Sequence, residues 1–469
     1  MRKGLIVLLV VVLAAMFALP AVAADIKAAG FYRSKAWMSN FHDGAGGPSL
    51  RTGEGTDTEQ TNAYVEQRAR AMFQFGTENV KAVWFLESDM LWGDSSAVVG
   101  RNQGGALGAD SIQIETKNLY LWFKLPDTSL DFTVGLQNQS DDYAGVLWGG
   151  ADFAGVFING KYEPVKWKLG WAKLYENATQ KTDDATLYQA NVYFVPTKDL
   201  TVGANFYFLQ DDTGKPGTAG AAKLNPGDAA TPPSGYSAKL YTPGVNVTWK
   251  AGPATITGFA AYQWGKFESV LDNASDIDVK AYMLDARGEM KIGPANAFLE
   301  GLYISGDDKE DEYNSVIGFG DYQGAGTGPG GNSSYTRTRM QIMLASWDTI
   351  NVSQCIVGCS GGEYGDSLGL QGRGLWHVAA GANMNLTPKI KAEANIGYAA
   401  AVKLRNGDTH TDKSIGTEIN AGVNYSIMQG LDFGLFGAYM WLGDFVQDPA
   451  PAASFKDPWT TYARINYAF

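Results

Sequence analysis

Apolar and polar residues alternate with a period of two along most of this chain. The stretch from Tyr64 to Asp89 shows the pattern clearly, because two alternating runs flank the short reversal Gly76-Thr77-Glu78. Alternating runs around a glycine-bearing turn predict a β-hairpin. One face of the hairpin is apolar, and the other carries charged residues such as Arg68 and Arg70. A soluble sandwich buries its apolar face, whereas a membrane barrel turns that face to lipid and lines a water-filled interior with the polar one.

The same alternation recurs in eighteen segments of about ten residues or more, the length that a tilted strand needs to cross a bilayer. They lie at 25–37, 62–76, 79–90, 112–125, 129–138, 152–162, 164–176, 185–195, 199–210, 237–250, 254–267, 277–291, 295–306, 372–386, 389–404, 415–428, 431–443 and 459–469. An even number of strands lets an antiparallel barrel close with both termini on one side.

Short and long connections alternate between these segments. The short ones are tight turns, such as Pro126-Asp127, Gly293-Pro294 and Gln429-Gly430. The long ones lie at 38–61, 91–111, 139–151, 177–184, 211–236, 268–276, 307–371, 405–414 and 444–458. Outer-membrane barrels have short periplasmic turns and long external loops. The sequence therefore predicts an all-β, transmembrane, antiparallel up-and-down barrel of about 18 strands, with 16 as the alternative.

The first residues predict an exported protein. Arg2-Lys3, an apolar run at 5–19 and Ala21-Val22-Ala23 make a basic region, an apolar region and a small-residue cleavage site. We expect a signal peptide at 1–23 and one barrel domain at 24–469, with a membrane-anchor helix as the alternative reading of the start. No later segment approaches the roughly 20 apolar residues of a spanning helix.

Composition excludes several classes of function. The chain has 37 Lys and Arg against 49 Asp and Glu, and removing Arg2 and Lys3 leaves 35 against 49, a net charge of about −14. Such acidity argues against nucleic acid as a partner. Only three histidines occur, too few to suggest a metal centre, and no cofactor is expected. Cys355 and Cys359 lie in a Gly/Ser-rich stretch, where export predicts a small loop disulfide, with free thiols as the alternative.

The last strand ends with Ile465, Tyr467 and Phe469 on the predicted lipid face. This ending resembles the sorting signal of bacterial outer-membrane proteins, which implies the barrel assembly machinery as a partner. The chain as a whole resembles a general bacterial porin, most closely the homotrimeric porins of Desulfovibrio-type sulfate-reducing bacteria. The resemblance implies a trimer in the outer membrane, surrounded by lipid and lipopolysaccharide. It also implies a third external loop folded inward.

The predicted site is a charged constriction of the pore. The loop at 139–151 would bring Asp141 and Asp142 into the lumen, because the resemblance folds it inward and its apolar Val146-Leu147-Trp148 needs a packing partner. An ordinary external loop is the alternative. By the same resemblance, basic residues of the early strands stand opposite the acidic loop: Arg33, Lys35, Arg68 and Arg70. Opposed fixed charges would orient dipolar solutes and filter ions.

Further charged residues are predicted to face the lumen. They are Glu87, Asp89, Asp285, Arg287, Glu289 and Arg464, of which the last four are expected to pair with one another. Two other motifs give weaker predictions. The acidic run at 307–312 could hold divalent cations but is expected to be a solvated loop. Gly365-Asp366-Ser367-Leu368-Gly369 fits G-x-S-x-G but lies in a loop rather than a strand-to-helix turn.

The sequence therefore predicts a porin for passive diffusion of small hydrophilic solutes and ions, not an enzyme. Net acidity favours weak cation selectivity, which Arg68 and Arg70 oppose. A substrate-specific porin is the first alternative and would need an aromatic ladder, for which Tyr120, Trp122, Tyr193 and Tyr207 are candidates. A hydrolase using Ser367 and a non-conducting structural barrel are the remaining alternatives.

Overall fold

A computed structural model describes residues 25–42, 61–95, 104–108, 112–176, 183–214, 236–269, 275–308, 312–319, 335–344, 355–358, 369–405, 407–447 and 456–469. The predicted signal peptide, Cys359 and Ser367 lie outside these ranges. No helix of the described part is long and apolar enough to span a membrane.

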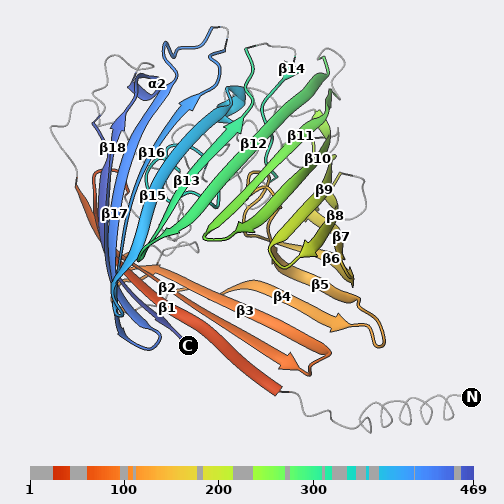
Figure 1. Ribbon diagram of the computed structural model, residues 1–469, viewed down its shortest axis with the longest axis horizontal. Coiled ribbons are helices and arrows are strands. Elements are labelled where there is room, and N and C mark those ends of the chain that lie inside the picture. Colours follow the sequence, from red (N-terminus) through yellow and green to blue (C-terminus); the bar gives the residue numbers. More distant parts are fainter. Residues whose placement is uncertain are drawn as a thin grey trace, which may run out of the picture.

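The chain forms one closed antiparallel barrel of 18 strands (Figure 1). Its strands are β1 (Asp25–Ser39), β2 (Asn62–Gly76), β3 (Val80–Leu91), β4 (Glu115–Lys124), β5 (Asp131–Gln139), β6 (Ala151–Tyr162), β7 (Val165–Tyr175), β8 (Ala185–Thr197), β9 (Leu200–Asp211), β10 (Tyr236–Ala251), β11 (Ala254–Ser269), β12 (Ile277–Ile292), β13 (Ala295–Ile304), β15 (Leu375–Thr387), β16 (Ile390–Ala401), β17 (Ser414–Met428), β18 (Leu431–Leu442) and β19 (Trp459–Ala468). Each strand pairs with its neighbours in the chain, and β1 closes the ring by pairing with both β2 and β19. The predicted barrel of 18 strands is confirmed.

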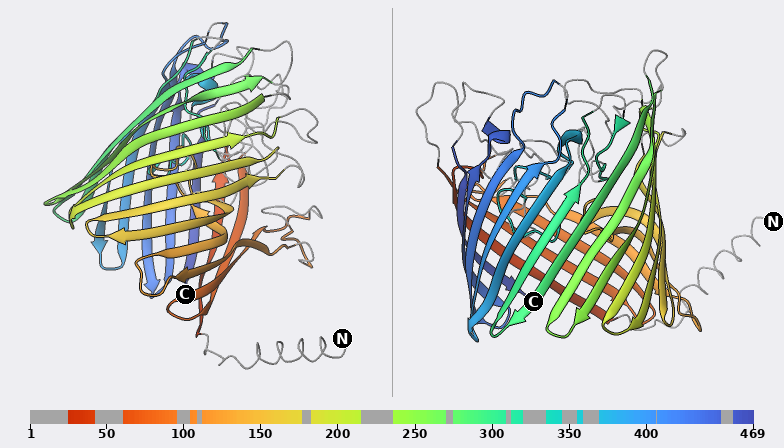
Figure 2. Two further views of the ribbon diagram at one scale, coloured as in Figure 1. Left: turned by 90° about the vertical axis from the view of Figure 1, so that its right-hand side faces the viewer. Right: turned by 45° about the horizontal axis from the view of Figure 1, so that its top comes forward.

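Three short elements lie outside the ring. They are β14 (Glu312–Tyr313), η2 (Leu370–Gly372) and α2 (Asp444–Gln447). β14 pairs in parallel with the start of β12, so the chain passes alongside the barrel wall before it returns to β15. The strand ends that lead into the long connections lie at one end of the barrel, and the short turns lie at the other (Figure 2).

The tight turns have the residues that their backbone requires. Gly252, Gly293 and Gly430 have φ values of +63°, +60° and +76°, a conformation in which a Cβ atom is strained. Several strands are shorter than predicted, and two of them are shortened next to a bulge. β4 begins at Glu115 rather than 112 and has a register shift near its start, and β16 ends at Ala401 rather than 404, next to a shift at Ala399. A bulge interrupts the ladder, so alternation alone places the strand end too far out.

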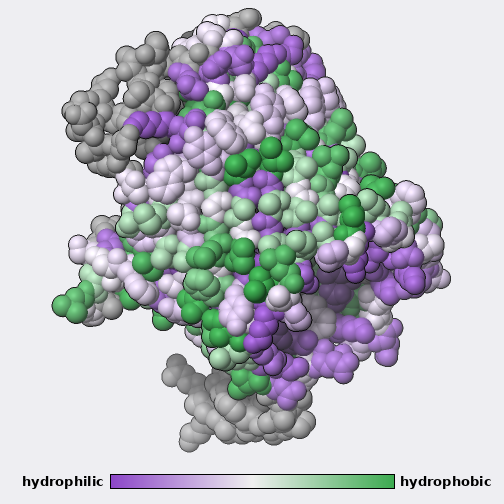
Figure 3. Space-filling model, turned by 60° about the vertical axis from the view of Figure 1, so that its left-hand side comes forward, coloured by the Kyte–Doolittle hydropathy of each residue, from purple (hydrophilic) through white to green (hydrophobic). Residues whose placement is uncertain are grey.

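The two faces of the strands differ as alternation predicts. On β9, Val202 and Phe206 are 40% and 38% exposed on the outer face, while Asn205 and Tyr207 are 4% and 1% exposed on the inner face. In this view apolar side chains gather across the middle of the surface among less hydrophobic ones, and hydrophilic ones surround a hollow at the lower right (Figure 3). An outer face with so many exposed apolar side chains is expected to lie in lipid.

An arginine on the outer face is expected to destabilise the barrel according to its depth. Leu435 lies near the middle of β18 and is 54% exposed, whereas Leu431 begins the same strand on the same face. Leu435→Arg should lower the free energy of unfolding by about 2–4 kcal/mol, because the charge sits near the bilayer midplane, and Leu431→Arg by about 0–1 kcal/mol. Denaturant titration of the protein in lipid vesicles measures both. Equal effects of the two substitutions would contradict the placement of this face in lipid.

Candidate functional site

The connection between β5 and β6 is organised around the carboxylate of Asp141. Its two oxygens accept four backbone N–H bonds, from Tyr143 (2.7 Å), Gly145 (2.8 Å), Leu147 (2.6 Å) and Trp148 (2.8 Å). A side chain that satisfies four buried donors replaces the secondary structure that this loop lacks. Gly145 supports the tight path with a φ of +86°.

Burial also changes the acidity of this group. It raises the pKa of the Asp141 carboxyl to about 6, while the four N–H donors act in the opposite direction. A carboxyl whose pKa is higher in the folded loop than in an open chain stabilises the fold more as pH falls through about 6. Mild acidification is therefore not expected to release this loop through Asp141.

The loop lies against the inner face of β8, β9 and β11. The Asp142 carboxylate accepts bonds from the Tyr193 and Tyr207 hydroxyls, at 2.7 and 3.0 Å, and from the Asn191 amide. The Tyr143 ring packs on Tyr207 and on Phe259 of β11, with ring centroids 5.4 and 5.5 Å apart. Two inner-face tyrosines thus hold the loop inside the barrel.

The apolar part of the loop is also buried. Val146, Leu147 and Trp148 are each 2% exposed or less. The Trp148 ring stacks on Phe319, which belongs to the long connection between β13 and β15, with centroids 5.8 Å apart. The predicted packing partner is therefore a second segment of the chain that also lies inside the barrel.

This second segment is held to the wall first by Gln263 of β11. The Gln263 amide makes two bonds to the backbone of Ile317: it donates to the carbonyl at 3.1 Å and accepts from the N–H at 2.8 Å. Gln263 is 1% exposed, so both bonds lie in a dry environment. Residues 312–319 consequently run beside β11 and β12.

Glu418 of β17 holds the next described stretch, 335–344. Its carboxylate accepts the backbone N–H groups of Gln341 (2.7 Å), Ile342 (3.0 Å) and Met343 (2.8 Å). Glu418 is 0% exposed, and its neighbour Asn420 donates to the carbonyl of Arg339 at 2.9 Å. A buried carboxylate again takes the place of a regular backbone partner.

The two inner segments contact each other. The N–H of Phe319 donates to the carbonyl of Leu147 at 2.6 Å, and the N–H and hydroxyl of Thr336 donate to the carbonyl of Ala144 at 2.8 and 2.9 Å. We call residues 140–150, 312–319 and 335–344 together the inner segments. They are bonded to the inner faces of β8, β9, β11 and β17, and the first of them also contacts β5 and β6 through Asn138 and Phe153.

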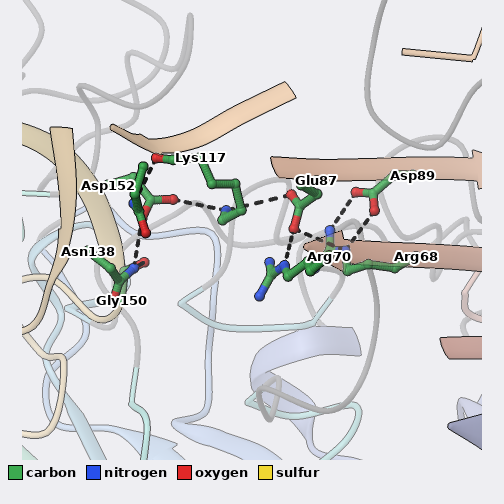
Figure 4. A network of polar contacts seen from close by, with 9 residues as sticks. Arg68, Arg70, Glu87, Asp89, Lys117, Asn138, Gly150 and Asp152 are labelled. Atoms are coloured by element: carbon green, nitrogen blue, oxygen red, sulfur yellow. Dashed lines mark hydrogen bonds and ion pairs between the residues drawn. The ribbon is translucent and has the colours of Figure 1, made fainter. Parts of the chain in front are cut away.

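A different arrangement covers the inner face of β2 to β4 (Figure 4). Arg68 forms a two-bond ion pair with Asp89, at 2.7 and 2.6 Å, and Arg70 pairs with Glu87. Lys117 bridges Glu87, at 3.6 Å, to Asp152 at the start of β6, at 2.9 Å. The Asp152 carboxylate also accepts the amide of Asn138, which in turn donates to the carbonyl of Gly150. The charged network therefore runs along the wall to the base of the inward loop.

The structure gives the predicted constriction residues different partners. Arg68 and Arg70 pair with the next strand, while Asp141 and Asp142 are bonded within their loop and to β8 and β9. Lys35 is 1% exposed, with its ammonium over the rings of Trp37 and Tyr462, and Arg33 lies over Phe31 on the same inner face. A field between the arginines and the aspartates across the bore stays a prediction.

The other predicted charges lie on the inner face with mixed partners. Arg287 pairs with Glu289, as expected, and also with Glu300. Asp285 instead pairs with Arg337 of the inner segments. Arg464 donates to Asn424 at 2.6 Å and lies over Phe436, far along the ring from Asp285.

The remaining predicted residues lie away from this site. Ile465, Tyr467 and Phe469 are 40%, 44% and 56% exposed on the outer face. Cys355 is buried and disulfide-bonded, and its predicted partner Cys359 is outside the described residues. Within the described ranges, no group of three or more His, Cys, Asp or Glu side chains could hold a metal ion.

Sequence reasoning missed Lys117, Gln263, Arg337 and the anchoring role of Glu418. Lys117 lies at the register shift of β4, where Phe85 pairs with Asn118 and Leu86 with Thr116. A bulge redirects one side chain in a way that alternation cannot show. The ion pairs of Arg68 and Arg70 had a readable signal, because a hairpin closed at 77–79 places them directly opposite Asp89 and Glu87.

Comparison with known proteins bears on this architecture. No family model matches the sequence, and no curated protein matches it. Among solved structures, the chain is similar to OccAB4 of Acinetobacter baumannii, with a TM-score of 0.54, 12% identity and coverage of 96% of this chain and 99% of that chain. It is also similar to OccK8 (OprE) of Pseudomonas aeruginosa, with a TM-score of 0.53, and to a BenF-like porin from Pseudomonas fluorescens Pf-5, with a TM-score of 0.52. Each of these two is 12% identical to the chain, and each comparison covers 95% of this chain and 98% of that chain. The chain shares the fold of these barrels. At this identity the likeness shows the fold alone, over nearly the whole of each chain.

Proposed function

We propose that the protein is an outer-membrane channel through which small hydrophilic solutes and ions diffuse passively. The observation that supports this most is a closed barrel with an apolar outer face and a charged inner face that water reaches. The inward side chains of Arg70 on β2 and Glu289 on β12 remain 24% and 52% accessible, and Arg337 of the inner segments remains 22% accessible. A ring of this size encloses an aqueous channel.

The solute path follows the charged wall. The inner segments are bonded to β8, β9, β11 and β17, and we place the solute route on the opposite side of the bore, along the charged residues of β2 to β4. Arg70 borders this route with its side chain 24% accessible, and it belongs to a largely buried network in which Arg68 pairs with Asp89 and Arg70 with Glu87. Paired charges give weak rather than strong ion selectivity, because each charge is largely cancelled at short range.

Removing the two arginines is expected to make the channel more selective for cations. In the double variant Arg68→Gln, Arg70→Gln, the carboxylates of Glu87 and Asp89 lose these arginine partners, and the net charge of this part of the wall becomes more negative. The permeability ratio of K⁺ to Cl⁻, obtained from reversal potentials in a salt gradient, should rise about twofold or more. The matched variant Glu87→Gln, Asp89→Asn should shift the ratio the other way. Shifts of the same sign in both variants would remove these residues from the route.

Flux measurements test the passage of solutes. Liposomes carrying the purified protein should swell in arabinose, glucose and sucrose at rates that fall with solute size and rise linearly with concentration. No swelling above that of protein-free liposomes would refute the proposed function.

A substrate-specific channel is the second candidate. Inner segments fixed by buried side chains favour it, because a rigid lining can position a particular solute. One solved structure with a similar fold is that of OpdK of Pseudomonas aeruginosa with vanillate. Two of the four residues predicted for an aromatic ladder, Tyr193 and Tyr207, bind Asp142 of the inward loop instead. Saturable rather than linear flux would favour this candidate.

The assembly and location follow from the same proposal. We place the protein in the outer membrane after export, as a homotrimer like the porins of sulfate reducers that it resembles, in contact with lipopolysaccharide. The outward row of Ile465, Tyr467 and Phe469 supports recognition by the barrel assembly machinery.

A further inference from the structure

His377 and Glu300 lie next to each other on neighbouring strands, on the inner face of the barrel. His377 lies on β15 and Glu300 on β13, and both side chains are fully buried. Nε2 of His377 is 3.6 Å from Oε1 of Glu300, and neither atom has a hydrogen-bond partner among the residues that the structure describes. Two buried polar atoms without partners are costly and need an explanation.

The other ring nitrogen decides the tautomer. Nδ1 of His377 lies 3.1 Å from the backbone carbonyl oxygen of Tyr398. A carbonyl oxygen only accepts, so Nδ1 carries the proton in the neutral ring and Nε2 is an acceptor. In the neutral state, two acceptors therefore oppose each other in a dry environment. One additional proton on Nε2 makes it a donor to Oε1 and satisfies both atoms.

We propose that His377 and Glu300 form a proton-binding site that controls how firmly the stretch 335–344 is held to the barrel wall. No bond other than N–H is made or broken: the proton comes from water and binds Nε2. Proton binding at this site does not depend on the proposed channel function. The predicted effect on ionic current rests on that function.

The surrounding charges favour an added proton. The groups around the pair are Asp285, Arg287 and Glu289 on β12, Tyr335 and Arg337 on the inner stretch, and Glu418 on β17 beyond Asn420. The Tyr335 ring contacts the His377 ring edge-on, with centroids 6.1 Å apart. Asp285, Glu289 and Glu300 outnumber Arg287 and Arg337 by one negative charge, which a protonated His377 balances. Glu418 is already satisfied by backbone N–H groups.

The pair is coupled to the inner stretch through Arg287. The guanidinium of Arg287 pairs with the other oxygen of Glu300 and also donates to the backbone carbonyl of Arg337 at 3.3 Å. Asp285 in turn binds the Tyr335 hydroxyl at 2.5 Å and the Arg337 side chain. A proton on His377 fixes Glu300 and, through it, these contacts. Its loss leaves Glu300 opposed by a second acceptor, and the hold on 335–344 weakens.

Proton binding can be measured without any current. In protein labelled with ¹³C and ¹⁵N in its three histidines and held in detergent micelles at about pH 5, the ring signals of His377 should be those of an imidazolium with a proton on both nitrogens. Glu300→Gln removes the opposing charge and should reduce the imidazolium fraction of His377 at the same pH. His410→Gln, a control in the connection between β16 and β17, should leave that fraction unchanged. A neutral His377 ring, or an imidazolium fraction that Glu300→Gln does not change, would overturn the proposal whether or not the protein conducts.

The consequence for current is tested separately. In planar bilayers, brief partial closures should be about tenfold or more frequent at pH 8 than at pH 5, because a charge-assisted bond to Glu300 is lost. His377→Gln should abolish this difference, while His410→Gln should keep it. A pH dependence that persists in His377→Gln would assign the effect to another group, such as Asp141, and contradict the proposed role of His377.

Discussion

Replacing Asp141 with alanine is expected to raise the single-channel conductance about twofold. Four buried N–H groups, those of Tyr143, Gly145, Leu147 and Trp148, would lose their shared acceptor. Each unsatisfied buried donor costs about 1–3 kcal/mol, and water can satisfy them only if the loop leaves the wall. A loop that leaves the wall no longer narrows the bore, so current per channel increases.

The comparison requires a control for the loss of one negative charge. Asp412 is an exposed aspartate in an external loop that caps the start of β17. Asp412→Ala should therefore leave conductance within a few per cent of that of the original protein. Both variants must be folded, which is shown by an unheated gel band that migrates faster than the band of the same protein after heat unfolding. A correctly folded Asp141→Ala protein with unchanged conductance would show that the loop does not limit current.

Replacing Glu418 with alanine is expected to release the stretch 335–344 from β17. Three backbone N–H groups, those of Gln341, Ile342 and Met343, lose their acceptor at a site that is 0% exposed. Losing three net bonds of about 1 kcal/mol each weakens the local hold by roughly 3 kcal/mol. Arg337 and Arg339 lie in this stretch and are sites for trypsin. Cleavage there should be at least about tenfold faster in the variant, because opening of the segment limits proteolysis.

Glu289→Ala provides the matched control. Glu289 is also an inward glutamate, but its side chain is half exposed and pairs with Arg287 instead of holding backbone. Its removal should leave cleavage at Arg337 and Arg339 close to the original rate. If Glu418→Ala and Glu289→Ala are cleaved equally slowly, Glu418 is not the anchor that its contacts suggest.

The sequence was sufficient to predict the barrel because lipid and water impose a period of two on every strand. Val202 and Phe206 on one face, with Asn205 and Tyr207 on the other, already define the inside and the outside. Turn residues such as Gly252 and Gly293 mark the short connections, and their alternation with long ones orders the strands. Strand ends were less well placed: those of β4 and β16 lie next to bulges, and β15 begins at Leu375 rather than at 372.

The interior was less predictable because its contacts join residues that are distant in the sequence. Glu418 has the same place in the alternation as Asn420 and Asn424, and nothing nearby in the sequence indicates that it binds 341–343. The connection between β13 and β15 lacks periodicity, so its path along the inner wall had no local signal. The partners of Arg68 and Arg70 were in principle readable, since the hairpin register places Asp89 and Glu87 directly opposite. The resemblance to porins directed attention instead to charges across the bore.

Single-channel recording of the purified mature protein in planar bilayers tests the central claim, that water fills a continuous path beside the inner segments. The predicted result is stepwise insertion events with equal current increments that vary linearly with voltage and salt concentration. Folded, membrane-inserted protein that produces no current steps would contradict the account, because it would mean that the inner segments close the barrel completely.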